Sequence, residues 1–167
     1  MNLEGLNSWT KTEAKNALLR CCGAARWAEE LADRRPFLSE QELFDAAERI
    51  WQGLDRHDWL EAFAAHPRIG DLNALRAKFS NTAAWSAGEQ AGLAGAPDVV
   101  LEALARGNRL YEEKFGYVFI ICATGKTAGE MLALLEERLK NDPDKELLIA
   151  AGEQAKITQL RLRKLCS

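Results

Sequence analysis

One of the two histidines of this chain lies in the stretch Ala65-His66-Pro67-Arg68-Ile69-Gly70-Asp71, directly before a proline. Histidine is the side chain best suited to give and take protons near neutral pH. A helix rarely continues through the residue that precedes a proline, so the His66 imidazole is expected at a structural corner with a fixed direction. Arg68 and Asp71 flank it. The sequence therefore makes His66 a candidate general acid.

A second polar motif, Ser86-Ala87-Gly88-Glu89-Gln90, follows in a stretch of weak periodicity. A serine with a glutamate three residues later is a capping box, and simple helix capping is one interpretation. The functional interpretation pairs Glu89 with another acid or base. His66 is the expected partner, because it lies on the neighbouring irregular segment and loops carry much of a protein's chemistry.

Two further features could bind a ligand. The run Phe119-Ile120-Ile121-Cys122-Ala123 is apolar and too short to assign by periodicity, and its simplest interpretation is core. If its backbone is not helical, its N–H and C=O groups can bind the edges of a heterocyclic amide. Arg161 is either a surface charge on the last helix or a carboxylate clamp, for which its planar fork is suited.

Nucleotide and metal sites are not predicted. Gly125-Lys126-Thr127 resembles the end of a phosphate-binding loop, but that motif needs a glycine where this chain has Ile120. Lys126 is better explained as part of a helix start or as a positive group near an anionic ligand. His57 and His66 form no His-x-x-x-His pair and have no cysteine partner at useful spacing. His57 is interpreted as a surface or capping residue.

Size and charge limit the remaining classes. A chain of 167 residues, 47% of them hydrophobic, is predicted to form a single domain over residues 1–167. A net charge of −3 gives no reason to expect nucleic acid as a partner. The basic clusters, Arg34-Arg35 and the tail Arg161, Arg163 and Lys164, are interpreted as solvated faces.

The cysteines indicate a reducing compartment. Cys21, Cys22, Cys122 and Cys166 show no C-x-x-C spacing, and three of them lie in apolar surroundings that suit small buried side chains. No stretch approaches the roughly 18 apolar residues that span a bilayer, and the N-terminal residues lack the pattern of a signal peptide. We therefore expect a cytoplasmic protein without a membrane segment.

Apolar residues recur at helical spacing almost everywhere, which predicts an all-α fold. We expect a single compact bundle of about seven to nine helices. The short helix before His66 should bury Trp59, Leu60 and Phe63, and Gly116 should end a long helix. The expected helices cover about 10–31 as one or two helices, 39–53, a short stretch ending at His66, 98–115, 127–140 and 142–165, with a turn or two at 73–79 and 86–94 in a loop-rich middle.

Together these pieces resemble a known family. The motifs that carry the resemblance are His66-Pro67-Arg68-Ile69-Gly70, Ser86-x-x-Glu89-Gln90, Phe115-Gly116-Tyr117-x-Phe119-Ile120, Gly125-Lys126 and Leu160-Arg161-Leu162. In this order, from about Leu6 to Leu165, the chain is similar to 2-oxo-4-hydroxy-4-carboxy-5-ureidoimidazoline (OHCU) decarboxylases. The resemblance implies a carboxy-lyase that converts OHCU to (S)-allantoin at the end of urate conversion.

The resemblance also implies roles for residues. His66 corresponds to the catalytic proton donor and Glu89 to a catalytic acidic residue. Arg161 corresponds to an arginine that contacts the substrate. The substrate is expected to contact Pro67, Ser86, Ala87, Gly88, Glu89, Gln90, Phe119, Ile120, Ile121, Cys122, Ala123 and Arg161. The family is all α, commonly homodimeric, and uses no cofactor. The peroxisomal S-K-L signal of many eukaryotic members is absent here, which favours the cytoplasm.

Two rival functions remain open from the sequence. In a non-catalytic helical adaptor, the five tryptophans Trp9, Trp27, Trp51, Trp59 and Trp85 would mark interface surfaces, although tryptophan at helical spacing is usually core. A small hydrolase acting on the imidazoline ring before decarboxylation would instead produce OHCU from 5-hydroxyisourate.

Overall fold

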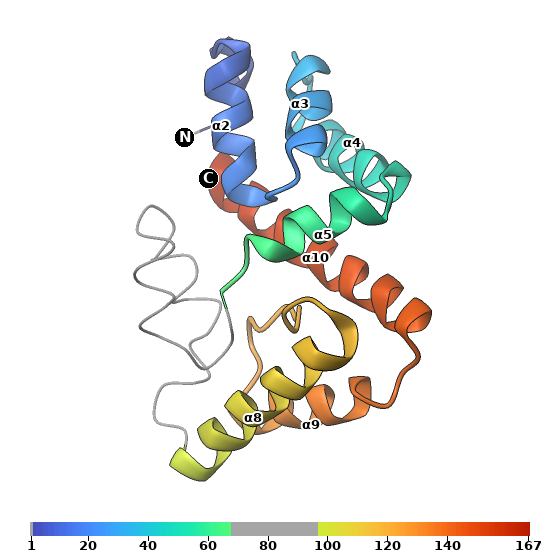
Figure 1. Ribbon diagram of the computed structural model, residues 1–167. Coiled ribbons are helices and arrows are strands. Elements are labelled where there is room, and N and C mark those ends of the chain that lie inside the picture. Colours follow the sequence, from blue (N-terminus) through green and yellow to red (C-terminus); the bar gives the residue numbers. More distant parts are fainter. Residues whose placement is uncertain (1, 68–96) are drawn as a thin grey trace. The chain divides into compact units, whose positions relative to one another are not determined.

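The computed structural model describes residues 2–67 and 97–167, and all regular structure in them is α-helical (Figure 1). The fold is all α, as the apolar periodicity predicts. None of the described helices is both long and apolar enough to cross a membrane. The expected short helical stretches at 73–79 and 86–94 lie outside the described residues. The helices are α1 (Leu3–Ser8), α2 (Lys11–Cys21), α3 (Ala25–Asp33), α4 (Glu40–Gly53), α5 (Arg56–Ala64), α8 (Asp98–Phe115), α9 (Ala128–Arg138) and α10 (Pro143–Cys166).

The described helices pack as two units. One unit comprises Met1–Ala65 together with Gln154–Ser167, and the other comprises His66–Glu153. Helix α10 is divided between them, because its first part belongs to the second unit and its last part to the first. The single domain expected over residues 1–167 stays a prediction.

Side-chain caps fix where the helices of the first unit begin. The Thr10 hydroxyl accepts from the Glu13 N–H at 3.3 Å and the Glu13 carboxylate accepts from the Thr10 N–H at 2.9 Å, a full capping box that starts α2. At α4 the corresponding box is only half formed. Ser39 accepts from the Glu42 N–H at 3.2 Å, but the Glu42 carboxylate accepts from the Leu38 N–H at 2.7 Å, one residue further upstream.

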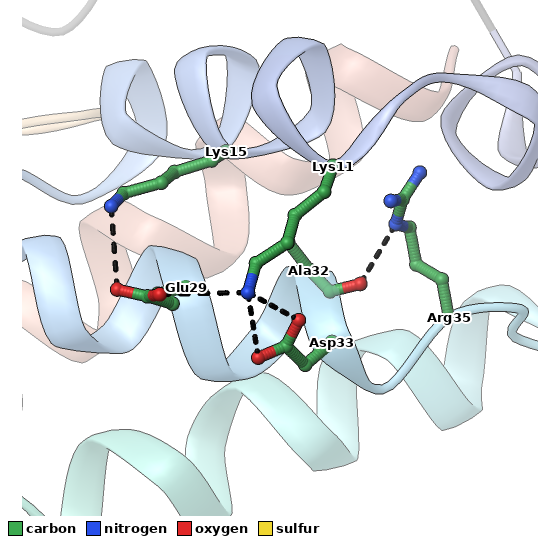
Figure 2. Close-up of polar contacts among 6 residues, drawn as sticks. All are labelled: Lys11, Lys15, Glu29, Ala32, Asp33 and Arg35. Carbon is green, nitrogen blue, oxygen red and sulfur yellow. Dashed lines mark hydrogen bonds and ion pairs between the residues drawn. The ribbon is translucent and has the colours of Figure 1, made fainter.

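Exposed ion pairs join α2 to α3. Figure 2 shows Lys11 reaching Asp33 and Glu29, and Lys15 reaching Glu29, with N–O distances of 2.8, 3.5 and 3.3 Å. Exposed pairs of this kind each contribute about 0–1 kcal/mol. The packing of these helices therefore depends mainly on their buried residues.

Arg35 differs from the solvated charge that the sequence suggested. Its Nε donates to the Ala32 carbonyl at 2.9 Å (Figure 2). Its Nη1 donates to the carbonyls of Leu6 and Trp9 at 2.8 and 2.7 Å. Carbonyls at the ends of helices have no partner within the helix, so Arg35 satisfies the ends of α1 and α3 and ties them together. Arg34 is exposed, as expected.

Two of the four tryptophans of the first unit lie in the core. Trp27 is fully buried and its indole N–H donates to the Ala47 carbonyl at 3.0 Å. Trp51 is buried, and its carbonyl accepts from the Trp59 indole N–H at 3.0 Å. Trp59 and Trp9 are partly buried, and Trp85 lies outside the described residues. These placements weaken the adaptor interpretation, which needs tryptophans on a surface.

Helix α5 is held close to the turn between α2 and α3. A Cβ atom built on Gly23 would lie 2.6 Å from the Ala65 Cβ and 3.7 Å from the Ala62 Cα. Both alanines are short and rigid, so neither can move aside by rotating a side chain. Gly23 is therefore required for the close approach of α5, and Ala65 directly precedes His66.

A Gly23→Ala variant is expected to lose about 1–3 kcal/mol of unfolding free energy, because the new methyl group overpacks this contact. Chemical denaturation monitored by far-UV circular dichroism measures the loss. Gly53→Ala is the control, since a Cβ there meets nothing within 4 Å. That variant should change stability by less than about 1 kcal/mol, in the stabilising direction. Equal effects of the two substitutions would contradict the assigned contact.

In the second unit, glycine also permits close helix packing. A Cβ on Gly107 of α8 would lie 2.6 Å from the Leu135 Cδ2 of α9. Gly116, with φ of 85°, ends α8 as predicted, because this left-handed conformation favours glycine. Lys114 Nζ donates to the carbonyls of Leu139 and Asn141 at 2.6 and 2.8 Å. The end of α8 is thereby fixed against the segment that follows α9.

Candidate active site

Helix α5 delivers the chain to His66. The Asp55 carboxylate starts the helix by accepting from the Asp58 N–H at 3.1 Å. Phe63 is fully buried and anchors it, whereas Trp59 and Leu60 are only partly buried. The helix ends at Ala64, two residues before His66, so the predicted corner is confirmed. His66 is partly exposed and Pro67 is buried.

The run from Phe119 to Ala123 is buried and has neither helical nor strand structure. The core interpretation is confirmed, and so is the irregular backbone that the ligand-binding interpretation requires. Several of its carbonyls are used internally. Arg138 Nη1 donates to the Ile120 carbonyl, and Lys126 Nζ donates to the Cys122 carbonyl at 2.7 Å. The Lys126 N–H donates to the Ala123 carbonyl at 3.0 Å.

The backbone N–H groups of the same segment differ from its carbonyls. Within residues 2–67 and 97–167, the N–H groups of Phe119, Ile120 and Ile121 donate to no other backbone or side-chain group. Buried backbone N–H groups are nearly always paired, and leaving one unpaired costs about 1–3 kcal/mol. The segment therefore has the donors that an amide ligand could satisfy.

Lys126 and Gly125 form a turn before α9. Gly125 has a φ of 78°, which glycine adopts without strain. The Thr127 hydroxyl accepts from the Glu130 N–H at 3.1 Å and starts α9, as predicted. Lys126 fastens the Phe119–Ala123 segment through two of its carbonyls. This placement fits the helix-start interpretation of Lys126.

Arg161 lies on α10 and is only 9% exposed. The interpretation as a surface charge is therefore wrong. Nearby, burial raises the pKa of Cys21 to about 12 and that of Cys22 to about 11, and the positive charge of Arg161 opposes both shifts. All four cysteines are buried, and none of them forms a disulfide.

The other predicted site residues lie in different parts of the chain. Glu89 and its neighbours Ser86, Ala87, Gly88 and Gln90 lie outside the described residues. His66 and the Phe119–Ala123 segment belong to one unit, and Arg161 belongs to the other. The interpretation of His57 is confirmed, because it is exposed in the first turn of α5. Its imidazole lies near the carboxylates of Asp55 and Asp58, of which the first caps α5.

A buried charge network that contacts the Phe119–Ala123 segment was not predicted from the sequence. Arg138 and Glu146 are 7% and 0% exposed, and they form an ion pair with an N–O distance of 2.6 Å. In the sequence both look like solvated charges near helix ends. The local sequence pattern contains no signal for this burial. The burial depends on Tyr111 of α8, a helix distant in the sequence, whose hydroxyl donates to Glu146 at 2.6 Å.

Comparison with known proteins matches the sequence of this chain to a known family. The sequence model of OHCU decarboxylase matches residues 7–163. The chain belongs to the OHCU decarboxylase family. It is 35% identical over 159 residues to the OHCU decarboxylase of Amia calva, covering 90% of this chain and 83% of that protein.

A plant relative is longer. The chain is 43% identical over 148 residues to a uric acid degradation bifunctional protein of Arabidopsis thaliana, covering 88% of this chain. It spans 45% of that protein, and 32% of a uric acid degradation bifunctional protein of a Bacillus species. The match therefore concerns one part of each bifunctional relative.

Two solved structures resemble the fold. A crystal structure of an OHCU decarboxylase in the presence of (S)-allantoin is 41% identical, with a TM-score of 0.73, and the match covers 88% of this chain and 94% of that one. A crystal structure of (S)-allantoin synthase has a TM-score of 0.71 at 21% identity, covering 98% of this chain and 54% of that one. The second likeness concerns the fold alone.

Proposed function

We propose that this chain catalyses the decarboxylation of OHCU to (S)-allantoin, in the cytoplasm and as a homodimer. The family match over residues 7–163 is the observation that carries the proposal. The crystal structure at 41% identity supports the product, because that relative was crystallised in the presence of (S)-allantoin. The buried Phe119–Ala123 segment, with backbone donors available, supports an amide-rich small molecule as the ligand.

The proposed substrate supplies its own electron sink. The carboxylate of OHCU is on a ring carbon next to a C=N bond. When the bond to CO2 breaks, its electron pair forms a C=C bond and the imine pair moves to nitrogen, which takes up one proton. The resulting enol loses its hydroxyl proton as the carbonyl forms, and the neighbouring carbon gains a proton. No organic cofactor is needed to stabilise the carbanion.

His66 delivers the last proton in this scheme. General acid help of this kind is typically worth about 10²- to 10⁴-fold. Pro67 restricts the approach of the imidazole, so that one face of the ring carbon receives the proton. Glu89 orients His66 and the substrate hydroxyl. It also assists the deprotonation of that hydroxyl as the carbonyl forms. The partial exposure of His66 at the end of α5 supports its access to a ligand.

The remaining residues of the proposed site bind the substrate. The ureido group and the ring amides are held by Ser86, Gln90 and the backbone of Phe119–Ala123. Ala87 and Gly88 also contact the substrate. Arg161 binds an edge of the molecule other than the leaving carboxylate. A guanidinium that gripped the carboxylate strongly would stabilise the ground state and slow the loss of CO2.

The loss of fresh OHCU, followed by NMR at several protein concentrations, tests the activity. We expect a rate above the spontaneous one that rises in proportion to protein, with allantoin as the product. A rate independent of protein would overturn the proposal. Formation of OHCU from 5-hydroxyisourate would favour the hydrolase instead. Light scattering tests the homodimer, which has twice the 18.6 kDa mass of one chain.

A further inference from the structure

A buried ion pair lies behind the Phe119–Ala123 segment. Arg138, at the end of α9, pairs with Glu146 in the first turn of α10, with Nη2–Oε1 and Nε–Oε1 distances of 2.6 and 2.7 Å. Glu146 is fully buried, and its second oxygen accepts from the Asn141 side-chain amide at 3.0 Å. Its first oxygen also accepts from the Tyr111 hydroxyl at 2.6 Å. Both oxygens of this carboxylate are therefore held in place.

Stability alone is a weak explanation for such a pair. Removing two charges from water costs several kcal/mol per ion, and replacing a buried ion pair by neutral side chains of similar volume is often neutral or stabilising. A buried pair that is kept despite this cost can serve to hold a neighbouring group in one orientation.

Arg138 holds the backbone of the Phe119–Ala123 segment. Arg138 Nη1 donates to the Ile120 carbonyl at 2.5 Å. The guanidinium carbon also lies 4.5 Å from the centre of the Phe119 ring, within the range of a cation–π contact. Phe119 in turn packs against Tyr111 in a T-shaped pair, with ring centres 5.2 Å apart. Arg138 therefore contacts both the backbone and a side chain of this segment.

Because the peptide bond is planar, the contact at the Ile120 carbonyl also fixes the direction of the following N–H. The Ile120 carbonyl and the Ile121 N–H belong to the same peptide plane and, in a trans peptide, point in opposite directions. Because Arg138 holds the carbonyl, the Ile121 N–H points away from the ion pair. Among the residues that the structure describes, this N–H has no acceptor.

We propose that Arg138, held by Glu146 and Tyr111, is a positioning residue that fixes the Ile120–Ile121 peptide so that the Ile121 N–H is presented to an amide carbonyl of the substrate. The inference rests on the proposed function, since the ligand is OHCU or allantoin. A donor that is already oriented needs no rearrangement when the ligand binds, which strengthens binding.

The test neutralises the pair without leaving a buried charge. In the double variant Arg138→Met/Glu146→Gln, the glutamine keeps an acceptor for the Tyr111 hydroxyl and the methionine fills the space of the arginine stem. The control is Lys140→Met/Glu137→Gln, which neutralises an exposed pair nearby whose side chains are 70% and 71% exposed. Thermal unfolding, (S)-allantoin affinity by calorimetry, and kcat and KM with fresh OHCU are measured for each.

We expect the double variant to stay folded, with a lower unfolding temperature because the buried Ile120 carbonyl loses its donor. It should bind (S)-allantoin roughly tenfold more weakly, the loss of about one oriented hydrogen bond. KM should rise by a similar factor while kcat changes less than about twofold, because binding and not proton transfer is affected. The control should match the wild type. A folded double variant with wild-type affinity and KM would overturn the inference.

A second measurement uses the wild-type protein, so the result does not depend on folding of a variant. With ¹⁵N-labelled protein, saturating (S)-allantoin should shift the Ile121 amide proton downfield, as expected for a new hydrogen bond. An unchanged Ile121 resonance in the bound protein would overturn the inference while leaving the proposed function standing. Wild-type protein that neither binds allantoin nor consumes OHCU would overturn both.

Discussion

The His66→Asn variant is expected to fold like the wild type and to lose enzymatic formation of (S)-allantoin from fresh OHCU. Asparagine cannot donate and regain a proton near neutral pH, so the reaction loses the general acid, worth about 10²- to 10⁴-fold. The fold should survive because His66 is only partly buried and lies outside α5. Turnover is measured by circular dichroism of the product, and folding by thermal unfolding.

His57→Asn is the matched control, since His57 is the only other histidine of the chain and is exposed in the first turn of α5, the helix that precedes His66. That variant should keep wild-type turnover. Full turnover in His66→Asn would refute the role of His66 as proton donor. A similar loss in both variants would point to damage of α5 rather than to catalysis.

The second large effect is expected for Arg161→Gln, which should bind (S)-allantoin about 10- to 100-fold more weakly. A hydrogen bond from a charged donor is worth roughly 1.5–3 kcal/mol, and glutamine cannot reproduce the planar fork. Allantoin lacks the leaving carboxylate, so calorimetry with allantoin reports only contacts to other edges of the ligand. A weaker complex therefore supports the proposed position of Arg161.

Arg163→Gln is the control for this substitution. Arg163 is exposed on the same helix, with its guanidinium 5.6 Å from the Phe44 ring, and its loss should leave allantoin affinity unchanged. If Arg161→Gln bound allantoin normally but showed a raised KM for OHCU, Arg161 would instead bind the carboxylate. Unfolding temperatures of both variants separate binding from stability, since Arg161 is buried.

Helix ends with strong local signals were predictable from the sequence. Helix α8 begins at Asp98 after a proline and ends at Phe115 before Gly116, as expected. Thr127 and the Asp142-Pro143 pair likewise mark the starts of α9 and α10. These signals work because caps, prolines and positive-φ glycines act within a few residues.

Burial that depends on distant partners was not predictable. Glu146 occupies the first turn of a helix, where a carboxylate is normally solvated and favourable, yet Tyr111 and Arg138 enclose it. Arg161 likewise has the sequence context of an exposed charge. The corner at His66 could be predicted, because Pro67 acts on its immediate neighbour. The irregular Phe119–Ala123 backbone was an open alternative, since a short apolar run has no decisive period.

Circular dichroism of the allantoin formed from fresh OHCU shows whether the proton is delivered to only one face of the ring carbon. Spontaneous decarboxylation has no chiral acid and should give racemic allantoin without a signal. With the wild-type protein we expect the signal of (S)-allantoin to grow at a rate proportional to protein and to reach the amplitude of the pure enantiomer. Racemic product, formed at the spontaneous rate at every protein concentration, would contradict stereospecific decarboxylation by this chain.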